Sequence, residues 1–228
     1  FGNNFHEKFH CTDHYLPASA TYNPDESDIQ ANIDSIIANA IDNDKFEIYY
    51  QPIYSVRQKK FASAEALLRL FDETHGFISP ELIIIAAEKN GSIHKIGELV
   101  FDKVCRFIAS DEYRQLGLDY IEVNLSVAQC MRADLADKIL ATIQKYQVNP
   151  DHINLEITET AISYSQKAMA DNLTKLSAAG FSFSLDDYGT GYSNMKRLIS
   201  LPLKLVKLDK SLVDEQSNPK MWLFLQNT

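Results

Sequence analysis

The 228-residue sequence predicts an α/β fold, a TIM-like (β/α)₈ barrel that lacks its last two strands in this chain. Strand-like and helix-like segments alternate along the chain, which is typical of a mostly parallel sheet covered by helices. Each predicted strand has one apolar face and one small or polar face, and the polar face gains charge toward the C-terminal end of the strand. No glycine-rich phosphate-binding loop follows the first strand, which disfavours an open nucleotide-binding sheet.

The elements follow in a regular order. Residues 1–26 are polar and aromatic without periodicity and end in a turn, so they are predicted to be a linker or the remnant of a preceding domain. Residues 27–228 are predicted to form one domain. It opens with a helix from Ser27, in which isoleucines recur at helical spacing until Asp42. Strands are then expected at residues 45–54, 60–67, 119–125, 152–157, 181–186 and 203–208, and helices at 80–109, 132–147, 165–179 and 192–199.

The alternation of faces along the strands favours a barrel over an open sheet. An open sheet with helices on both sides is apolar on both faces, whereas these strands are apolar on one face only. A barrel with a polar interior explains the pattern, and barrels of this kind carry their active sites at the C-terminal mouth. Six strands are found where a complete barrel needs eight, and residues 221–225 have the pattern of a further helix.

Composition narrows the classes of function. The net charge of −9 and the absence of a lysine- or arginine-rich block argue against binding a nucleic-acid polymer. The three cysteines have no CxxC spacing, so a reducing cytoplasm suits the chain better than an oxidising compartment. The sequence starts at Phe1 and contains no long apolar segment, and we expect a cytoplasmic domain of a longer protein, with membrane attachment of that protein left open.

Oxygen-bearing side chains converge at the predicted mouth of the barrel. They are Glu65, Asn124, Glu156, Asp186 and Asp187. Carboxylates with one amide, and no thiolate or imidazole, favour Mg²⁺ or Mn²⁺ over zinc, and adjacent aspartates suit two ions in phosphodiester hydrolysis. Lys207 enters the same space and is expected to orient water or contact a phosphate. The alternative is that each acid only caps the next helix, which four strands with ligands at one rim make less plausible. Glu122 shares the parity of Asn124 but lies deeper, and it is interpreted as structural.

The motifs in this part of the chain resemble those of the EAL-domain cyclic-di-GMP phosphodiesterases. The name-giving tripeptide is Glu65-Ala66-Leu67. Six further blocks follow the order of that family: Tyr50-Gln51-Pro52-Ile53, Ile78-Ser79-Pro80, Val123-Asn124-Leu125-Ser126, Leu155-Glu156-Ile157-Thr158-Glu159, Asp186-Asp187-Tyr188-Gly189-Thr190-Gly191-Tyr192-Ser193 and Lys207-Leu208-Asp209-Lys210-Ser211-Leu212-Val213. A single tripeptide has no specificity, but seven blocks in sequence over residues 45–228 make the resemblance specific.

The resemblance implies a role for each matching position. Glu65, Asn124, Glu156 and Asp186 correspond to metal ligands, and Asp187 to the ligand of a second metal. Lys207, Glu65 and Asp187 take catalytic roles, with Lys207 helping to activate water. Contacts with cyclic-di-GMP are assigned to Gln51, Leu68, Arg69 and Asp209, and Glu159 is assigned as the anchor of the loop 187–193. The implied product is linear pGpG, and the implied partners are a second copy of the chain and an upstream diguanylate cyclase or sensor domain.

The sequence also departs from the family pattern. Tyr188 replaces the usual phenylalanine, and the C-terminal blocks with a further catalytic glutamate and a Gln-Gly pair are not found in the chain. Another metal-dependent barrel enzyme with similarly placed acids is disfavoured by Gln51-Pro52-Ile53 and the loop 187–193. Two functions remain the main alternatives at this point. One is a metal-dependent cyclic-di-GMP phosphodiesterase, and the other is a non-catalytic module that binds the dinucleotide or a protein partner as a sensor.

Overall fold

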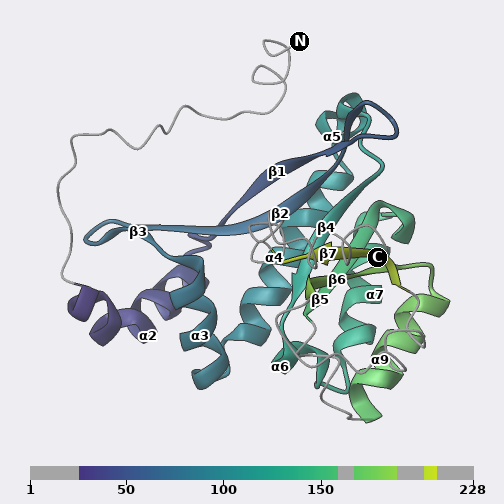
Figure 1. The fold of residues 1–228 in the computed structure, drawn as a ribbon. Helices are drawn as coiled ribbons and strands as arrows, with labels where there is room; N and C mark the ends of the chain where they lie inside the picture. Colours follow the sequence, from purple (N-terminus) through teal and green to yellow (C-terminus); the bar gives the residue numbers. More distant parts are fainter. Residues whose placement is uncertain (1–25, 159–166, 189–202, 210–228) are drawn as a thin grey trace, which may run out of the picture.

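The computed structural model describes residues 26–158, 167–188 and 203–209 (Figure 1). The predicted leader, residues 1–26, lies outside these ranges except for its last residue. The helix expected at 192–199 and the helical segment at 221–225 also lie outside the described residues. No helix within the described ranges is both long and apolar enough to cross a membrane.

One sheet forms the centre of the fold. Its strands are β1 (Glu47–Ser55), β2 (Lys60–Asp72), β3 (Gly76–Ile78), β4 (Tyr120–Leu125), β5 (Ile153–Thr158), β6 (Ser182–Tyr188) and β7 (Leu203–Leu208). The order is β1-β2-β4-β5-β6-β7, and β3 pairs with the C-terminal end of β2. β1 and β3 run antiparallel to β2, and the other neighbours are parallel. All six predicted strands are confirmed, whereas the three-residue β3 is too short to show a period.

Helices follow the strands as a parallel sheet requires (Figure 1). They are α2 (Glu26–Asp42), α3 (Pro80–Asn90), α4 (Ile93–Ile108), α5 (Asp111–Leu116), α6 (Val127–Cys130), α7 (Leu135–Tyr146) and α9 (Lys167–Ala178), with a 3₁₀ turn, η1 (Pro150–His152), before β5. The predicted helices from Ser27, at 132–147 and at 165–179 are confirmed with end shifts of a few residues.

The prediction of one helix over residues 80–109 is wrong, because the chain turns at Gly91. Gly91 has a φ of 81°, in the left-handed region that glycine adopts without a Cβ clash, and it ends α3. Two residues later α4 begins at Ile93. The apolar periodicity continues across this break because α3 and α4 both bury a face in the same core, and periodicity alone does not separate them.

The apolar faces of the strands pack on these helices. Ala64, Val123, Leu155 and Phe183 belong to the larger core, together with buried residues of α4, α7 and α9. A second core joins α2, α3 and the start of α4 to the far end of β2. On the opposite face of the sheet the buried residues are polar, namely Ser63, Glu122, Asn154, Glu156 and Ser184. The predicted division into one apolar and one polar face is thereby confirmed.

A contact between distant strands shows that the sheet curves. Three strands lie between β2 and β7, so in a flat sheet they would be about 19 Å apart. Lys207 Nζ on β7 nevertheless lies 3.1 Å from Glu65 Oε2 on β2. The sheet therefore bends around its polar face as in a barrel, and β1 and β7 do not pair with each other within the described residues. This open, curved sheet agrees with the predicted incomplete TIM-like barrel.

Candidate metal centre

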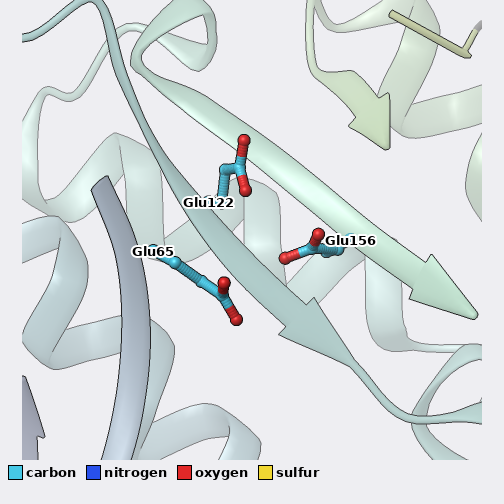
Figure 2. Close-up of side chains that lie close together, drawn as sticks. All are labelled: Glu65, Glu122 and Glu156. Atoms are coloured by element: carbon cyan, nitrogen blue, oxygen red, sulfur yellow. The ribbon is translucent and has the colours of Figure 1, made fainter. Parts of the chain in front are cut away.

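Three glutamates from neighbouring strands gather on the polar face of the sheet. Glu65 of β2, Glu122 of β4 and Glu156 of β5 each place a carboxylate oxygen within 4.8 Å of the other two (Figure 2). The parallel register brings them together, because Glu65 lies opposite Glu122 and Asn124 lies opposite Glu156. Glu122 and Glu156 are fully buried, whereas Glu65 is partly open. We call these three residues the acidic trio.

Lys207 binds all three members of the acidic trio. Its Nζ lies 3.1 Å from Glu65 Oε2 and 2.8 Å from Glu122 Oε2, and it also forms an ion pair with Glu156 Oε1. Burial lowers the pKa of Lys207, but the contacts with Glu122 and Glu156 outweigh burial and raise it well above the ordinary value. Lys207 therefore carries a positive charge at neutral pH, and its predicted position beside the acids is confirmed.

Asn124 connects the trio to the rim of the sheet. Its Nδ2 donates a hydrogen bond to Glu65 Oε1 over 2.9 Å, while Lys207 contacts the other oxygen of the same carboxylate. Glu65 is thus held from two sides by residues of β4 and β7. Such outer hydrogen bonds orient a carboxylate for metal binding.

Three ionised carboxylates carry more negative charge than Lys207 neutralises, and burial makes that charge unfavourable. Burial chiefly raises the pKa of Glu156 to about 8, against the opposing effect of Lys207, and the charges of Glu122 and Glu65 add to the rise. The pKa of Glu122 is also raised by burial, with Glu65 and Asp186 contributing. With all three glutamates ionised, one ammonium leaves two negative charges in the cluster, which is the charge that one divalent cation supplies.

The buried oxygens fit a metal ion. Glu122 Oε1 and Glu156 Oε2 have no hydrogen-bond partner among the described residues, whereas the other oxygen of each carboxylate contacts the Lys207 ammonium. Buried polar atoms in proteins nearly always have a partner, so such oxygens point to a missing one. Carboxylate oxygens are the ligands that hard divalent cations prefer. The acidic trio is therefore suited to a divalent metal ion.

Asp186 and Asp187 end β6 beside the trio but are not members of it. The pairing of β6 with β7 is irregular between Leu185 and Tyr188, and Asp187 has a φ of 55°. Irregular strand ends of this kind redirect side chains and often occur at functional sites. Burial raises the pKa of Asp187, and the charges of Asp186 and Asp209 raise it further. The structure thus brings Asp187 near Asp209, whose backbone N donates to Tyr188 O over 3.2 Å.

The residues predicted to contact a substrate have different surroundings in the structure. Gln51 is the antiparallel partner of Glu65. Leu68, Arg69 and Asn124 help to line a cavity of about 490 Å³ between β2, β4 and the helices α3, α4 and α7, and no member of the acidic trio is part of its lining. Glu159, the predicted loop anchor, lies outside the described residues, as does residue 189 onward of its loop.

Side-chain parity separates the two leucines after Glu65. Leu67 shares the face of Glu65 and Arg69, because side chains alternate along β2, whereas Leu68 packs against the core around α3. Arg69 lies with its guanidinium carbon 5.8 Å from the centre of the Tyr49 ring on β1. Sequence reasoning did not single out Leu67 and Tyr49 as candidates, although period-two alternation places Leu67 on that face.

Glu122 was interpreted as structural, and its place in the acidic trio revises that interpretation. It has two trio neighbours and contacts Lys207 directly. Its inward parity with Asn124 is visible in the sequence, but the sequence does not show that Lys207 reaches to its depth along the strand. The length of a glutamate and a lysine side chain bridges that depth.

Comparison with known proteins places these features in a family. The profile of the family described as "EAL domain" matches residues 34–227. The signaling protein YkoW of Bacillus subtilis is 33% identical over 194 residues, which cover 84% of this chain and 24% of YkoW. MucR of Pseudomonas aeruginosa, named a bifunctional diguanylate cyclase/cyclic di-GMP phosphodiesterase, is 34% identical over 185 residues, covering 78% of this chain and 26% of MucR. The chain thus spans about a quarter of these relatives.

A solved structure agrees with the sequence matches. The PaMucR phosphodiesterase in complex with c-di-GMP superimposes with a TM-score of 0.76 at 32% identity. The alignment covers 83% of this chain and 76% of that one. The curved sheet and its flanking helices therefore have a counterpart in a phosphodiesterase that binds this dinucleotide.

Proposed function

Since the chain belongs to the EAL-domain family, we propose that it hydrolyses cyclic-di-GMP to linear pGpG with the help of Mg²⁺ or Mn²⁺. The observation that carries this proposal is the acidic trio around Lys207, in which the buried oxygens Glu122 Oε1 and Glu156 Oε2 have no hydrogen-bond partner among the described residues. A site of this charge is unfavourable unless a cation binds to it.

In the proposed function, Glu65, Asn124, Glu156 and Asp186 hold one metal ion, and Asp187 contributes to a second. A divalent cation at this place lowers the pKa of a water molecule and neutralises charge that develops on the phosphate. Asn124 supports the proposal because it fixes the carboxylate of Glu65 through a 2.9 Å hydrogen bond. Asp187 supports it because partial desolvation and the charges of Asp186 and Asp209 raise its pKa, and a cation nearby would offset this repulsion.

The remaining residues would bind and orient the dinucleotide. Gln51 lies opposite Glu65 on β1 and Arg69 lies four residues beyond Glu65 on β2, and both suit contacts with phosphate and base edges; Leu68 and Asp209 would be further contacts. Lys207 donates from its ammonium to the attacking water or to a phosphate oxygen. The water oxygen forms a bond to phosphorus and releases a proton, the bond from phosphorus to the ribose 3′ oxygen breaks, and that oxygen takes up a proton, so that one water molecule is consumed for each bond opened. One opened phosphodiester gives pGpG.

The cellular setting is part of the same proposal. We infer a cytoplasmic domain that acts as a homodimer, beside a diguanylate cyclase or sensor domain in a longer protein. The family membership and the bifunctional description of MucR, of which this chain matches only 26%, support a multidomain context. We also propose that Glu159 anchors the loop 187–193, which would link dimerisation to the metal site.

The decisive experiment is incubation of the full-length protein with cyclic-di-GMP and Mg²⁺ or Mn²⁺, followed by chromatography of the products. We expect linear pGpG from the wild type, and a loss of at least about a hundredfold in Glu156→Gln. Glu112→Gln, which removes an exposed acid on α5, is the matched control and is expected to behave as wild type. Dinucleotide binding without product in either metal would replace the enzyme with the sensor.

A further inference from the structure

Lys207 and a metal ion would compete for two of the carboxylates that Lys207 contacts. Glu65 and Glu156 are both candidate ligands of a divalent cation and both bind the Lys207 ammonium in the structure. Two cations in contact with the same buried carboxylates repel each other strongly, because the low dielectric of the interior screens them little. Glu65 and Glu156 therefore cannot turn to a metal ion and keep Lys207 as they hold it now.

Glu122 differs from the other two members of the acidic trio. Glu65 accepts a hydrogen bond from Asn124 and Glu156 lies opposite Asn124, whereas Glu122 lies two residues before Asn124 on β4, level with Glu65 and about 7 Å deeper along the strand than Glu156. Its neighbour on β5, Asn154, is already used, since it donates to Ser182 Oγ over 3.0 Å and accepts from Ser184 Oγ. Lys207 is the cation that Glu122 contacts among the described residues.

We propose that Glu122 is the positioning residue of the site, the carboxylate that keeps Lys207 beside the reaction centre when Glu65 and Glu156 bind the metal. This inference rests on the proposed function and assigns a role that neither the strand pattern nor the family resemblance gave to Glu122. In the metal-free protein Lys207 substitutes for the cation between the three carboxylates. With metal bound, Lys207 retains Glu122 alone and stays within reach of the phosphate.

The consequence of losing Glu122 follows from the charges. With glutamine at this position, metal binding would leave a buried ammonium without an anion, which is strongly unfavourable. Lys207 would then keep its ion pairs with Glu65 and Glu156, and these ion pairs would compete with metal binding. Metal affinity falls for this reason only while Lys207 is present, and the reaction loses a correctly placed ammonium even at saturating metal.

A double-mutant cycle on Mn²⁺ binding, measured by titration calorimetry on the full-length protein, tests this role. The four proteins are the wild type, Glu122→Gln, Lys207→Met and the double variant. We expect Glu122→Gln to weaken Mn²⁺ binding about tenfold in the wild type and less than about twofold in the Lys207→Met background. A simple field effect of removing one carboxylate would lower affinity by the same factor in both backgrounds, and that result would overturn the inference.

Two further measurements distinguish a positioning role of Glu122 from a purely structural role. The thermal midpoint of Glu122→Gln shows whether the isosteric variant folds, and Glu112→Gln serves as the surface control for loss of one acid. At saturating Mn²⁺ we expect kcat for cyclic-di-GMP to fall about tenfold with KM within about twofold of wild type. Coupling in the Mn²⁺ cycle without any hydrolysis by the wild type would refute the proposed phosphodiesterase and leave the role of Glu122 standing. Failure of the wild type to bind Mn²⁺ would overturn both.

Discussion

Asn124, near the C-terminal end of β4, orients the carboxylate of Glu65. Its Nδ2 donates to Glu65 Oε1 over 2.9 Å, and its own oxygen is a candidate metal ligand. We expect Asn124→Ala to lower both Mn²⁺ affinity and hydrolysis by about tenfold to a hundredfold, because Glu65 loses its orientation. Calorimetry and product chromatography measure the two effects. Asn39→Ala on the exposed face of α2 is the control, and wild-type Mn²⁺ affinity in Asn124→Ala would remove Asn124 from the site.

Gly97 lies where α4 passes the chain segment that follows β4. A Cβ at this position would lie 1.8 Å from Nε2 and 2.9 Å from Cδ of Gln129. Gln129 is buried and closes a capping box with Ser126, in which its Oε1 accepts from Ser126 N over 2.9 Å. We expect Gly97→Ala to lower the free energy of unfolding by about 1–3 kcal/mol in urea titrations, because Gln129 must move out of the box.

The contact with Gln129 can be tested separately from helix propensity. In the double variant with Gln129→Ala, the loss should be smaller than the sum of the two single losses, since the clash no longer exists. Lys95→Ala, on the exposed side of the same helix, should change the free energy of unfolding by less than about 0.5 kcal/mol. A stable Gly97→Ala protein would mean that Gln129 moves aside without loss.

At the scale of single residues the sequence predicts which side chains share the inner face, but not how deep into the barrel they interact. Strand parity found Glu65, Asn124, Glu156 and Lys207, because a period of two is a property of the chain itself. It could not decide how far down the strand a side chain still contributes. That depends on the curvature of the sheet, which brings Lys207 to Glu122 and is not encoded in any one strand.

Between elements, Asp102 connects α4 to α7. It accepts hydrogen bonds from Lys145 Nζ over 2.7 Å and Tyr146 OH over 2.8 Å, both on α7, and from Arg106 Nη2 over 3.1 Å on its own helix. Burial raises the pKa of Asp102, but these hydrogen bonds outweigh burial and lower it. At pH 7 we expect Asp102→Asn to lower the free energy of unfolding by about 1–2 kcal/mol.

The pH dependence of that loss has a definite sign. Because the pKa of Asp102 is lower in the folded state, its contribution is present above the unfolded pKa, near 4, and disappears as pH falls through the folded value. The wild type and Asp102→Asn should therefore converge in stability in acid, as measured by urea unfolding from pH 7 to pH 3. Asp111→Asn, whose ion pair with Arg114 is exposed, should show little difference at any pH. A constant gap would show that Asp102 acts by packing.

The elements themselves were predictable where they are long and periodic. The six long strands and the helices α2, α7 and α9 gave clear patterns. α5 was missed because its six residues cover less than two turns, although Ser110 caps it by accepting from Tyr113 N. The boundary between α3 and α4 was missed because it depends on the left-handed backbone of Gly91 alone.

For the whole molecule, the polar interior is stabilised by charge instead of by apolar packing. The apolar cores lie between the sheet and its helices, and on the concave side Lys207 links β7 to β2 and β5 as well as to β4. The curvature that defines a barrel is therefore supported in the structure by one lysine and three carboxylates. A barrel was predicted from polarity, but the contact that joins distant strands could only be seen once they were folded together.

Replacing Lys207 should show how much Lys207 and a bound metal ion each contribute to the stability of the fold. Lys207→Met leaves the acidic trio without its ammonium, and in EDTA at pH 8 we expect a loss of about 3–5 kcal/mol in the free energy of unfolding, because buried carboxylates lose their partner. Mn²⁺ should restore most of this loss, so that its addition raises the thermal midpoint more in Lys207→Met than in the wild type. Lys204→Met, an exposed lysine of the same strand 4.5 Å from the Tyr120 ring centre, is the matched control and should lose less than about 1 kcal/mol. Equal Mn²⁺ shifts in the wild type and Lys207→Met would show that Lys207 and the metal do not compete for the same carboxylates.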